Sequence, residues 1–307
     1  MKGLAFQALP VKPSLLGESP LWHPVEQRLY WCDIPAKLLN CYDPITAVHQ
    51  RWPLDSEPGC CAAVQGGGLL LALRRGLVFF EPSTGDLRTL VAAPYDSRLE
   101  RFNDGKTDAD GRFWLGTIYE PRDATNAALY CFDGEQLIKR GDGITTSNGL
   151  AWSPGGDVMY WADTKAHSVR AFDFDMVTGS MTRPRTFCEF PGKTADQDLA
   201  SYKGRPDGAA VDAQGCYWVA MFEGARLMRF APTGEPLAEI ELPVRCPTMP
   251  CFGGADLKTL YLTTSRENRP ALELEREPLA GYVLHTRVEV PGLPSALARA
   301  PKLGELR

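Results

Sequence analysis

RFNDGKTDADGRFWLGT, residues 101–117, has two parts with different chemistry. The first part, residues 101–106, gathers guanidinium, amide and carboxylate groups that are able to hold a metal ion or a sugar. The second part, residues 107–117, is a turn followed by an aromatic strand. Similar turns and strands recur along the chain. Residues 107–117 therefore indicate the fold, and residues 101–106 are candidates for a site.

The recurring unit is an apolar pair, a turn containing Pro, Gly or Asp, and a strand rich in β-branched and aromatic residues. Six copies occur, at residues 21–31, 63–71, 107–115, 151–161, 210–219 and 251–262. They recur about every 40 to 57 residues, and a further short strand and turn follow most copies. A period in this range with about four strands per unit is typical of a β-propeller, in which neighbouring blades cover each other's faces.

The six units predict an all-β fold, a six-bladed β-propeller with four-stranded antiparallel blades. We expect residues 1–307 to form a single domain, because no linker interrupts the repeat. Residues 4–12 precede the first full unit and are expected to complete the last blade and close the ring. A solenoid or a sandwich is the alternative. No long stretch has helical periodicity.

Composition and charge argue against several classes of partner. The formal net charge is −5, without the basic stripe that nucleic-acid binding requires. The most apolar run, residues 68–80, is broken by Arg74 and Arg75, so no membrane span is expected. The nine cysteines lack metal-finger spacing and the first residues lack a secretory pattern. We therefore expect reduced thiols in a cytoplasmic protein. We also expect a monomer or a weak homo-oligomer.

Four segments that precede the recurring turn carry polar residues at matching positions. Glu18, Asn103, Asn148 and Asp207 each lie shortly before the apolar phrase of their own unit. The innermost strands of a propeller line its central channel, so we expect these four side chains to face one another at one end of it. The alternative is that Asn-Gly and Asp-Gly only mark turns. Asp104, next along its strand, is expected to point away into a hydrogen-bond network.

The same residues predict metal-assisted chemistry. Two carboxylates and two amides converging in a channel would repel each other and stay unpaired without a cation, and hard divalent ions such as Ca²⁺ take oxygen ligands of these types. None of the four histidines lies at these positions, which argues against structural zinc. No Ser-His-Asp triad or phosphate-binding loop is evident. A bound ion would polarise a carbonyl while a carboxylate activates water. Arg101 either binds a developing oxyanion or forms a surface ion pair.

Seven motifs carry a resemblance to a known family. They are LGESPLWHP at residues 16–24, RFNDGK at 101–106, GRFWLGT at 111–117, SNGLAWS at 147–153, YWADTKAHSVRAFDFD at 160–175, PDG at 206–208 and FGGADLKTLYLTT at 252–264. In this order, and over nearly the whole chain, they resemble the SMP-30/gluconolactonase family of regucalcin-like sugar lactonases.

The resemblance implies a six-bladed propeller with one divalent ion in its channel, Ca²⁺ foremost, with Zn²⁺, Mn²⁺, Mg²⁺ and Fe²⁺ as other candidates. It implies that Glu18, Asn148 and Asp207 are the metal ligands and that Asp207 is also the catalytic base or acid. Arg101 and Asn103 would hold the substrate. The implied reaction is that of a gluconolactonase-like hydrolase acting on carboxylic esters, which opens an aldonolactone to the aldonic acid.

The chain departs from the family pattern at two places. The animal members carry acidic residues at the third and fourth positions after the Gly-Thr pair, and here these positions are Glu120 and Pro121. Either Glu120 or Tyr119 makes the corresponding substrate contact, or the contact is absent. An insertion at residues 191–205, directly before Asp207, is expected to form a lid over the site.

Two other functions compete with the lactonase prediction. A propeller fold also suits a non-enzymatic scaffold that binds calcium or protein partners, because fold alone does not define function. A related propeller hydrolase, acting on phosphotriesters or aryl lactones, is the second alternative.

Overall fold

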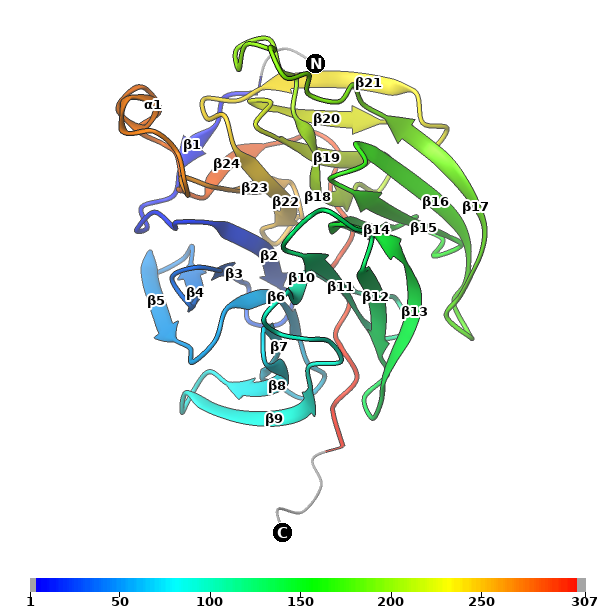
Figure 1. Ribbon diagram of the computed structural model, residues 1–307. Coiled ribbons are helices and arrows are strands. Elements are labelled where there is room, and N and C mark those ends of the chain that lie inside the picture. The colour runs from blue at the N-terminus through cyan, green and yellow to red at the C-terminus, as the bar shows by residue number, and fades with distance from the viewer. Residues whose placement is uncertain (1–3, 303–307) are drawn as a thin grey trace.

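The structure, a computed structural model, describes residues 4–302, so the predicted domain of residues 1–307 extends beyond the described part at both ends. Within the described residues, 24 strands form six four-stranded antiparallel sheets. The sheets are arranged around a common centre like the blades of a propeller, with one strand of each nearest the centre (Figure 1). The predicted all-β, six-bladed fold is confirmed.

The blades follow one another in chain order, and the strands of each blade run from the innermost to the outermost. Blade 1 comprises β2 (Gly17–His23), β3 (Arg28–Asp33), β4 (Leu38–Asp43) and β5 (Val48–Pro53), and blade 2 comprises β6 (Pro58–Ala63), β7 (Leu69–Leu73), β8 (Gly76–Glu81) and β9 (Asp86–Ala92). Blade 3 comprises β10 (Glu100–Thr107), β11 (Phe113–Tyr119), β12 (Ala127–Phe132) and β13 (Leu137–Ile144), and blade 4 comprises β14 (Ser147–Trp152), β15 (Val158–Asp163), β16 (Ser168–Asp175) and β17 (Ser180–Glu189). Blade 5 comprises β18 (Arg205–Val211), β19 (Tyr217–Phe222), β20 (Arg226–Phe230) and β21 (Pro236–Glu241), and blade 6 comprises β22 (Pro247–Gly253), β23 (Thr259–Thr264), β24 (Leu284–Arg287) and β1 (Gln7–Ala8).

Both ends of the chain help to close the ring. β1 pairs with β24, with Gln7 opposite His285, so the N-terminal segment completes blade 6 as the sequence predicted. After β24 the chain forms isolated bridges to two other blades, at Asp212 in blade 5 and Val64 in blade 2. It therefore crosses one mouth of the central channel.

The hydrophobic core is divided among the contacts between blades. Six clusters of buried residues occur in the described chain, and each joins one blade to its neighbour. The cluster between blades 6 and 1 includes Trp22 stacked on Tyr261, with ring centroids 5.9 Å apart. Because each sheet is covered on both faces by its neighbours, the inner strands are almost completely buried whereas most residues of the outer strands are partly or fully exposed.

The recurring turn is stabilised by one buried aspartate in each of two blades. Asp212 is fully buried; its Oδ2 accepts hydrogen bonds from Nε1 of Trp218 at 2.9 Å and from Nη2 of Arg229 at 2.7 Å. Asp108 in blade 3 accepts equivalent bonds from Trp114 and Arg112. The Asp of the turn and the Trp of the following strand therefore act as a pair, which explains why they recur together.

Two segments lie outside the strand pattern. The helix α1 (Ala271–Arg276) lies between β23 and β24 and has only six residues, too short to leave a periodic signal in the sequence. The predicted insertion, residues 191–205, forms a loop between β17 and the start of β18. None of the helices in the described residues has the length and hydropathy needed to cross a membrane.

Candidate active site

A cavity of about 800 Å³ opens at one end of the central channel. Its wall includes Glu18, Arg101, Asn103, Asn148 and Asp207, five of the seven site residues that the sequence predicted. They come from the inner strands of blades 1, 3, 4 and 5. Glu18 is half-buried, and the other four are 3–8% exposed. The structure thus brings together residues that lie up to 189 positions apart.

A β-bulge occurs in each inner strand near the positions that the predicted site residues occupy. The pairing of every inner strand with the next strand shifts register once. In the four strands that carry predicted site residues, the shifts lie between Glu18 and Leu21, Phe102 and Gly105, Asn148 and Ala151, and Pro206 and Ala209. Bulges bend a strand and redirect side chains, and they are common beside active sites.

The polar residues of blades 3 and 4 form a continuous hydrogen-bond chain. Nη1 of Arg101 donates to Oδ1 of Asn103 at 2.8 Å. Nδ2 of Asn103 donates to Oδ1 of Asn148 at 3.1 Å, and Nδ2 of Asn148 donates to Oγ1 of Thr164 at 2.8 Å. These bonds fix the orientation of both amides, so that the carbonyl oxygen of Asn148 keeps one lone pair for a ligand.

The carboxyl groups of Glu18 and Asp207 have raised pKa values. Burial raises the pKa of Glu18 well above its usual range, and the negative charge of Asp207 raises it further. Burial likewise raises the pKa of Asp207, although the Arg205 guanidinium opposes this effect. Carboxyl groups with raised pKa values hold a proton more tightly, or bind a cation that takes the place of the proton.

The donor set fits a hard divalent cation. Glu18 and Asp207 supply carboxylate oxygens and Asn148 an amide oxygen, which are the ligands that Ca²⁺ prefers. A cation between the carboxylates would remove the repulsion that raises the pKa of Glu18. No cluster of three or more His, Cys, Asp or Glu side chains able to hold a metal occurs within residues 4–302.

Asp104 has the predicted position. Its carboxylate is turned away from the cavity, and its Oδ2 accepts a hydrogen bond from the backbone N–H of Leu150 at 2.9 Å. Burial raises its pKa, while the charge of Lys106 lowers it. The residue therefore connects the inner strands of blades 3 and 4, and its neighbour Asn103 faces the cavity.

Tyr119 and Glu120 are not part of the cavity wall in this structure. β11 ends at Tyr119, whose ring packs beside the hydrophobic cluster between blades 3 and 4. Glu120 accepts two hydrogen bonds of 2.8 Å from Arg74, and its Oε1 lies 3.4 Å from Nε of Arg101. Glu120 is held by two arginines, so it orients Arg101 rather than reaching the cavity itself.

Sequence reasoning missed several residues that do line the cavity. Arg122 follows the expected contact position, and its backbone lies in the left-handed region with a φ of 59°. His167 lies in the turn after β15, within the motif at residues 160–175. Lys193 and Tyr202 come from the insertion. The insertion offered the one available signal, because the sequence placed it beside Asp207.

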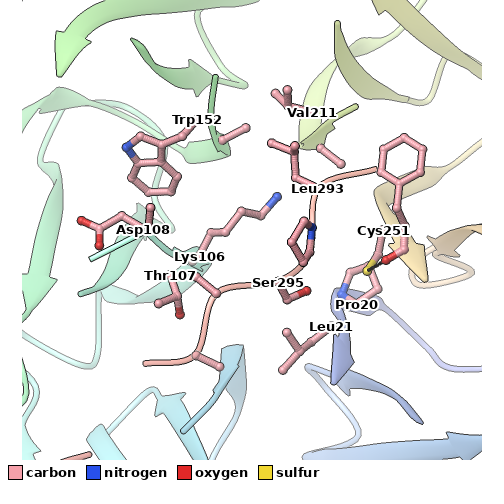
Figure 2. Close-up of a pocket in the computed structure, with 18 of the residues that line it drawn as sticks. Pro20, Leu21, Lys106, Thr107, Asp108, Trp152, Val211, Cys251, Leu293 and Ser295 are labelled. Atoms are coloured by element: carbon pink, nitrogen blue, oxygen red, sulfur yellow. Dashed lines mark hydrogen bonds between the residues drawn. The ribbon is translucent and has the colours of Figure 1, made fainter. Parts of the chain in front are cut away.

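A second cavity, of about 300 Å³, lies along the C-terminal halves of the inner strands. The larger cavity lies along their N-terminal halves. Lys106 points into the second cavity, and Leu293 and Ser295 of the C-terminal segment lie opposite (Figure 2). Nζ of Lys106 donates a hydrogen bond to the backbone oxygen of Ala209 at 2.5 Å. The walls are largely apolar, and none of the predicted site residues lines this cavity. The candidate active site is therefore the larger cavity.

Comparison with known proteins places the chain in a family. The family model described as the SMP-30/gluconolactonase/LRE-like region matches residues 16–266. A 6-deoxy-6-sulfogluconolactonase of Pseudomonas putida is 43% identical over 285 residues, which are 92% of this chain and 94% of the relative. Regucalcin of Homo sapiens is 34% identical over 274 residues, 87% of this chain and 89% of the relative.

A solved structure agrees over the whole propeller. The crystal structure of a calcium-binding protein, regucalcin from Agrobacterium tumefaciens, has a TM-score of 0.89 at 26% identity and covers 96% of this chain and 98% of its own. With the matching family model and the relatives above 30% identity, this agreement means that the chain belongs to the SMP-30/gluconolactonase/LRE-like family.

Proposed function

We propose that the chain is a hydrolase acting on carboxylic esters, which opens a sugar lactone to its aldonic acid with the help of one divalent metal ion. The observation that carries the proposal is the convergence of Glu18, Arg101, Asn103, Asn148 and Asp207 on one cavity. The 43% identical relative is named for a sulfonated gluconolactone, which makes aldonolactones the substrates to test first.

Glu18, Asn148 and Asp207 would hold the metal ion, with Ca²⁺ as the leading candidate. When bound, the ion withdraws electron density from the lactone carbonyl and makes its carbon more electrophilic. The calcium-binding regucalcin of known structure supports this choice of ion.

The residues of the chain supply the remaining chemistry. Asp207 accepts a proton from water as the water oxygen bonds to the carbonyl carbon, and later returns the proton to the ring oxygen as the ester bond breaks. Nη1 of Arg101 is occupied by Asn103 and by the backbone oxygen of Phe102, whereas Nη2 makes no hydrogen bond within residues 4–302. Nη2 is thus available to stabilise the oxyanion.

Asn103 would contact the sugar as an acceptor. Its Nδ2 already donates to the backbone oxygen of Ser147 and to Asn148. Its Oδ1 accepts one bond from Arg101 and keeps a second lone pair for a sugar hydroxyl.

The proposal is tested by following acid release from a panel of aldonolactones with a pH indicator. Asp207→Asn should lower kcat about a hundredfold or more, because it removes the catalytic base. Asp142→Asn, at an exposed ion pair on the outer strand β13, is the matched control and should keep the wild-type rate. Chelation should abolish activity, and a divalent ion should restore it.

Two results would replace the proposal with another function. Tight calcium binding without turnover of any lactone would support a calcium-binding scaffold. Faster hydrolysis of paraoxon or an aryl lactone than of every aldonolactone would support a related propeller hydrolase.

A further inference from the structure

The insertion and the turn after β15 together form a basic part of the cavity wall. Lys165 and His167 come from the turn, Lys193 and Tyr202 come from the insertion, and Arg205 begins β18 where the insertion ends. Nε2 of His167 lies 2.8 Å from the hydroxyl of Tyr202, and Nζ of Lys193 lies 5.4 Å from the centre of the Tyr202 ring. The His167–Tyr202 pair therefore joins the two segments, and the ammonium group of Lys193 lies beside it.

The two lysines of this wall form no ion pair among the described residues. The lysine ion pairs within residues 4–302 involve Lys139, Lys203 and Lys302, so they include neither Lys165 nor Lys193.

Arg205 has a carboxylate partner, but it shares that partner. Glu223 lies 2.7 Å from Nη1 of Arg205 and 2.9 Å from Nη1 of Arg269. Arg269 also forms a two-bond ion pair with Glu273, so the two guanidinium groups are matched by two carboxylates and the unpaired positive charge lies on Lys165 and Lys193.

The titration of His167 is consistent with this excess of positive charge. Burial lowers its pKa, and the charges of Arg205 and Lys165 lower it further. His167 therefore remains neutral near neutral pH and adds no charge of its own. Unpaired cationic side chains on the wall of a cavity attract anionic groups of a ligand.

We propose that Lys165, Lys193 and Arg205 form a subsite for an anionic group that the lactone carries away from its carbonyl. The ligand chemistry is a tetrahedral oxyanion, either a sulfonate or a phosphate ester. This inference rests on the proposed function, because it concerns the same cavity and the same substrate. It assigns the insertion a role in selecting the substrate.

The test compares three lactones that differ only at C6: D-glucono-1,5-lactone, its 6-deoxy-6-sulfonate and its 6-phosphate. Wild-type kcat/KM should be at least about tenfold higher for one of the charged lactones than for the neutral one, since charge-assisted contacts are strong in a cavity. The charged lactone with the higher kcat/KM shows whether the subsite selects a sulfonate or a phosphate ester. Equal or faster hydrolysis of the neutral lactone would overturn the subsite.

A double variant tests the residues. In Lys165→Gln/Lys193→Gln, the ratio of charged to neutral kcat/KM should fall about tenfold, through KM. Arg88→Gln/Lys139→Gln removes the same charge from outer strands and should leave the ratio unchanged. A ratio that falls equally in both double variants would attribute the preference to net charge and overturn the assignment.

Binding of the products separates this inference from the proposed function. Titration calorimetry with gluconate and with 6-deoxy-6-sulfogluconate or 6-phosphogluconate requires no turnover. Tighter binding of an acid that carries the C6 anion than of gluconate, lost in the Lys165→Gln/Lys193→Gln variant, supports the subsite even if no lactone is opened. Equal binding of gluconate and the C6-substituted acids would overturn it, whatever the lactonase assay gives.

Discussion

Nδ2 of Asn103 donates a hydrogen bond to Oδ1 of Asn148 across 3.1 Å, although 45 positions separate the two residues in the chain. The same nitrogen also donates to the backbone oxygen of Ser147 at 3.0 Å. The inner strands of blades 3 and 4 are thereby joined at the cavity. The bond also orients the amide oxygen of Asn148, which the sequence predicts to be a metal ligand.

Asn103→Ala should weaken both substrate binding and metal binding. The variant loses the acceptor for the sugar and releases the Asn148 amide, so we expect kcat/KM to fall about tenfold or more and the metal Kd to rise. Initial rates and calcium titration measure the two effects. Asn126→Ala, at an exposed loop position, is the control. A variant that loses activity but binds calcium like the wild type would show that Asn148 does not depend on Asn103.

Asp207→Asn should stabilise the metal-free protein, increasingly so at higher pH. Burial raises the pKa of Asp207 in the folded state, so above about pH 4, the usual range of an unfolded Asp, the folded state binds more protons than the unfolded state. The folded wild-type protein therefore loses stability as the pH rises through this window. The Asp207→Asn variant does not, because its amide does not titrate.

Thermal unfolding in EDTA between about pH 5 and pH 8 should show the Tm difference growing with pH. Saturating calcium should reverse its sign, because only the wild type then gains the full free energy of metal binding. A Tm difference that does not change with pH would contradict the raised pKa.

Gly149→Ala should destabilise the fold more than Gly143→Ala. Both glycines have left-handed backbones, with φ values of 61° and 72°, so each alanine costs about 1 kcal/mol of strain. An added Cβ at Gly149 would lie 2.4 Å from the Tyr217 hydroxyl, whereas at Gly143 it would meet nothing within 4 Å. Urea unfolding should show a further loss of about 1–3 kcal/mol for Gly149→Ala. Equal losses would mean that Tyr217 moves aside freely.

Asp212→Ala should be among the most destabilising exchanges of an ion-pair residue. It leaves Arg229 and the Trp218 N–H without their buried partner, and we expect a loss of about 3–5 kcal/mol in the free energy of unfolding. Asp256→Ala removes the exposed partner of Arg287 and should cost less than about 1 kcal/mol. Similar losses for the two variants would refute the role of the buried aspartate in stabilising the turn.

The propeller could be predicted because its signal is repeated and local. Each blade needs a turn and aromatic strands of its own, so the pattern at residues 107–117 recurs in every unit, and a period of about 40 to 57 residues leaves few alternatives. The helix α1 could not be predicted in this way, since it occurs once and spans fewer than two turns.

The candidate site was predictable where its residues lie on the repeated strands. Glu18, Asn103, Asn148 and Asp207 share one register, so their convergence followed from the repeat once a ring was assumed. Tyr119 and Glu120 lie where β11 ends and a loop begins, and there the register no longer indicates where a side chain points. Glu120 contacts both Arg74 and Arg101, and only the folded structure brings these three side chains together.

The sequence by itself determined the number of blades, the strand on which each polar residue lies and the family resemblance, because these depend on local patterns and their spacing. Only the tertiary structure decided that Tyr119 and Glu120 lie outside the cavity wall and that His167, Lys193 and Tyr202 belong to it. The Asn103–Asn148 hydrogen bond joins blades 3 and 4, and the His167–Tyr202 contact brings the insertion to the turn after β15. Such contacts join residues distant in the chain, and they depend on packing that no local pattern encodes.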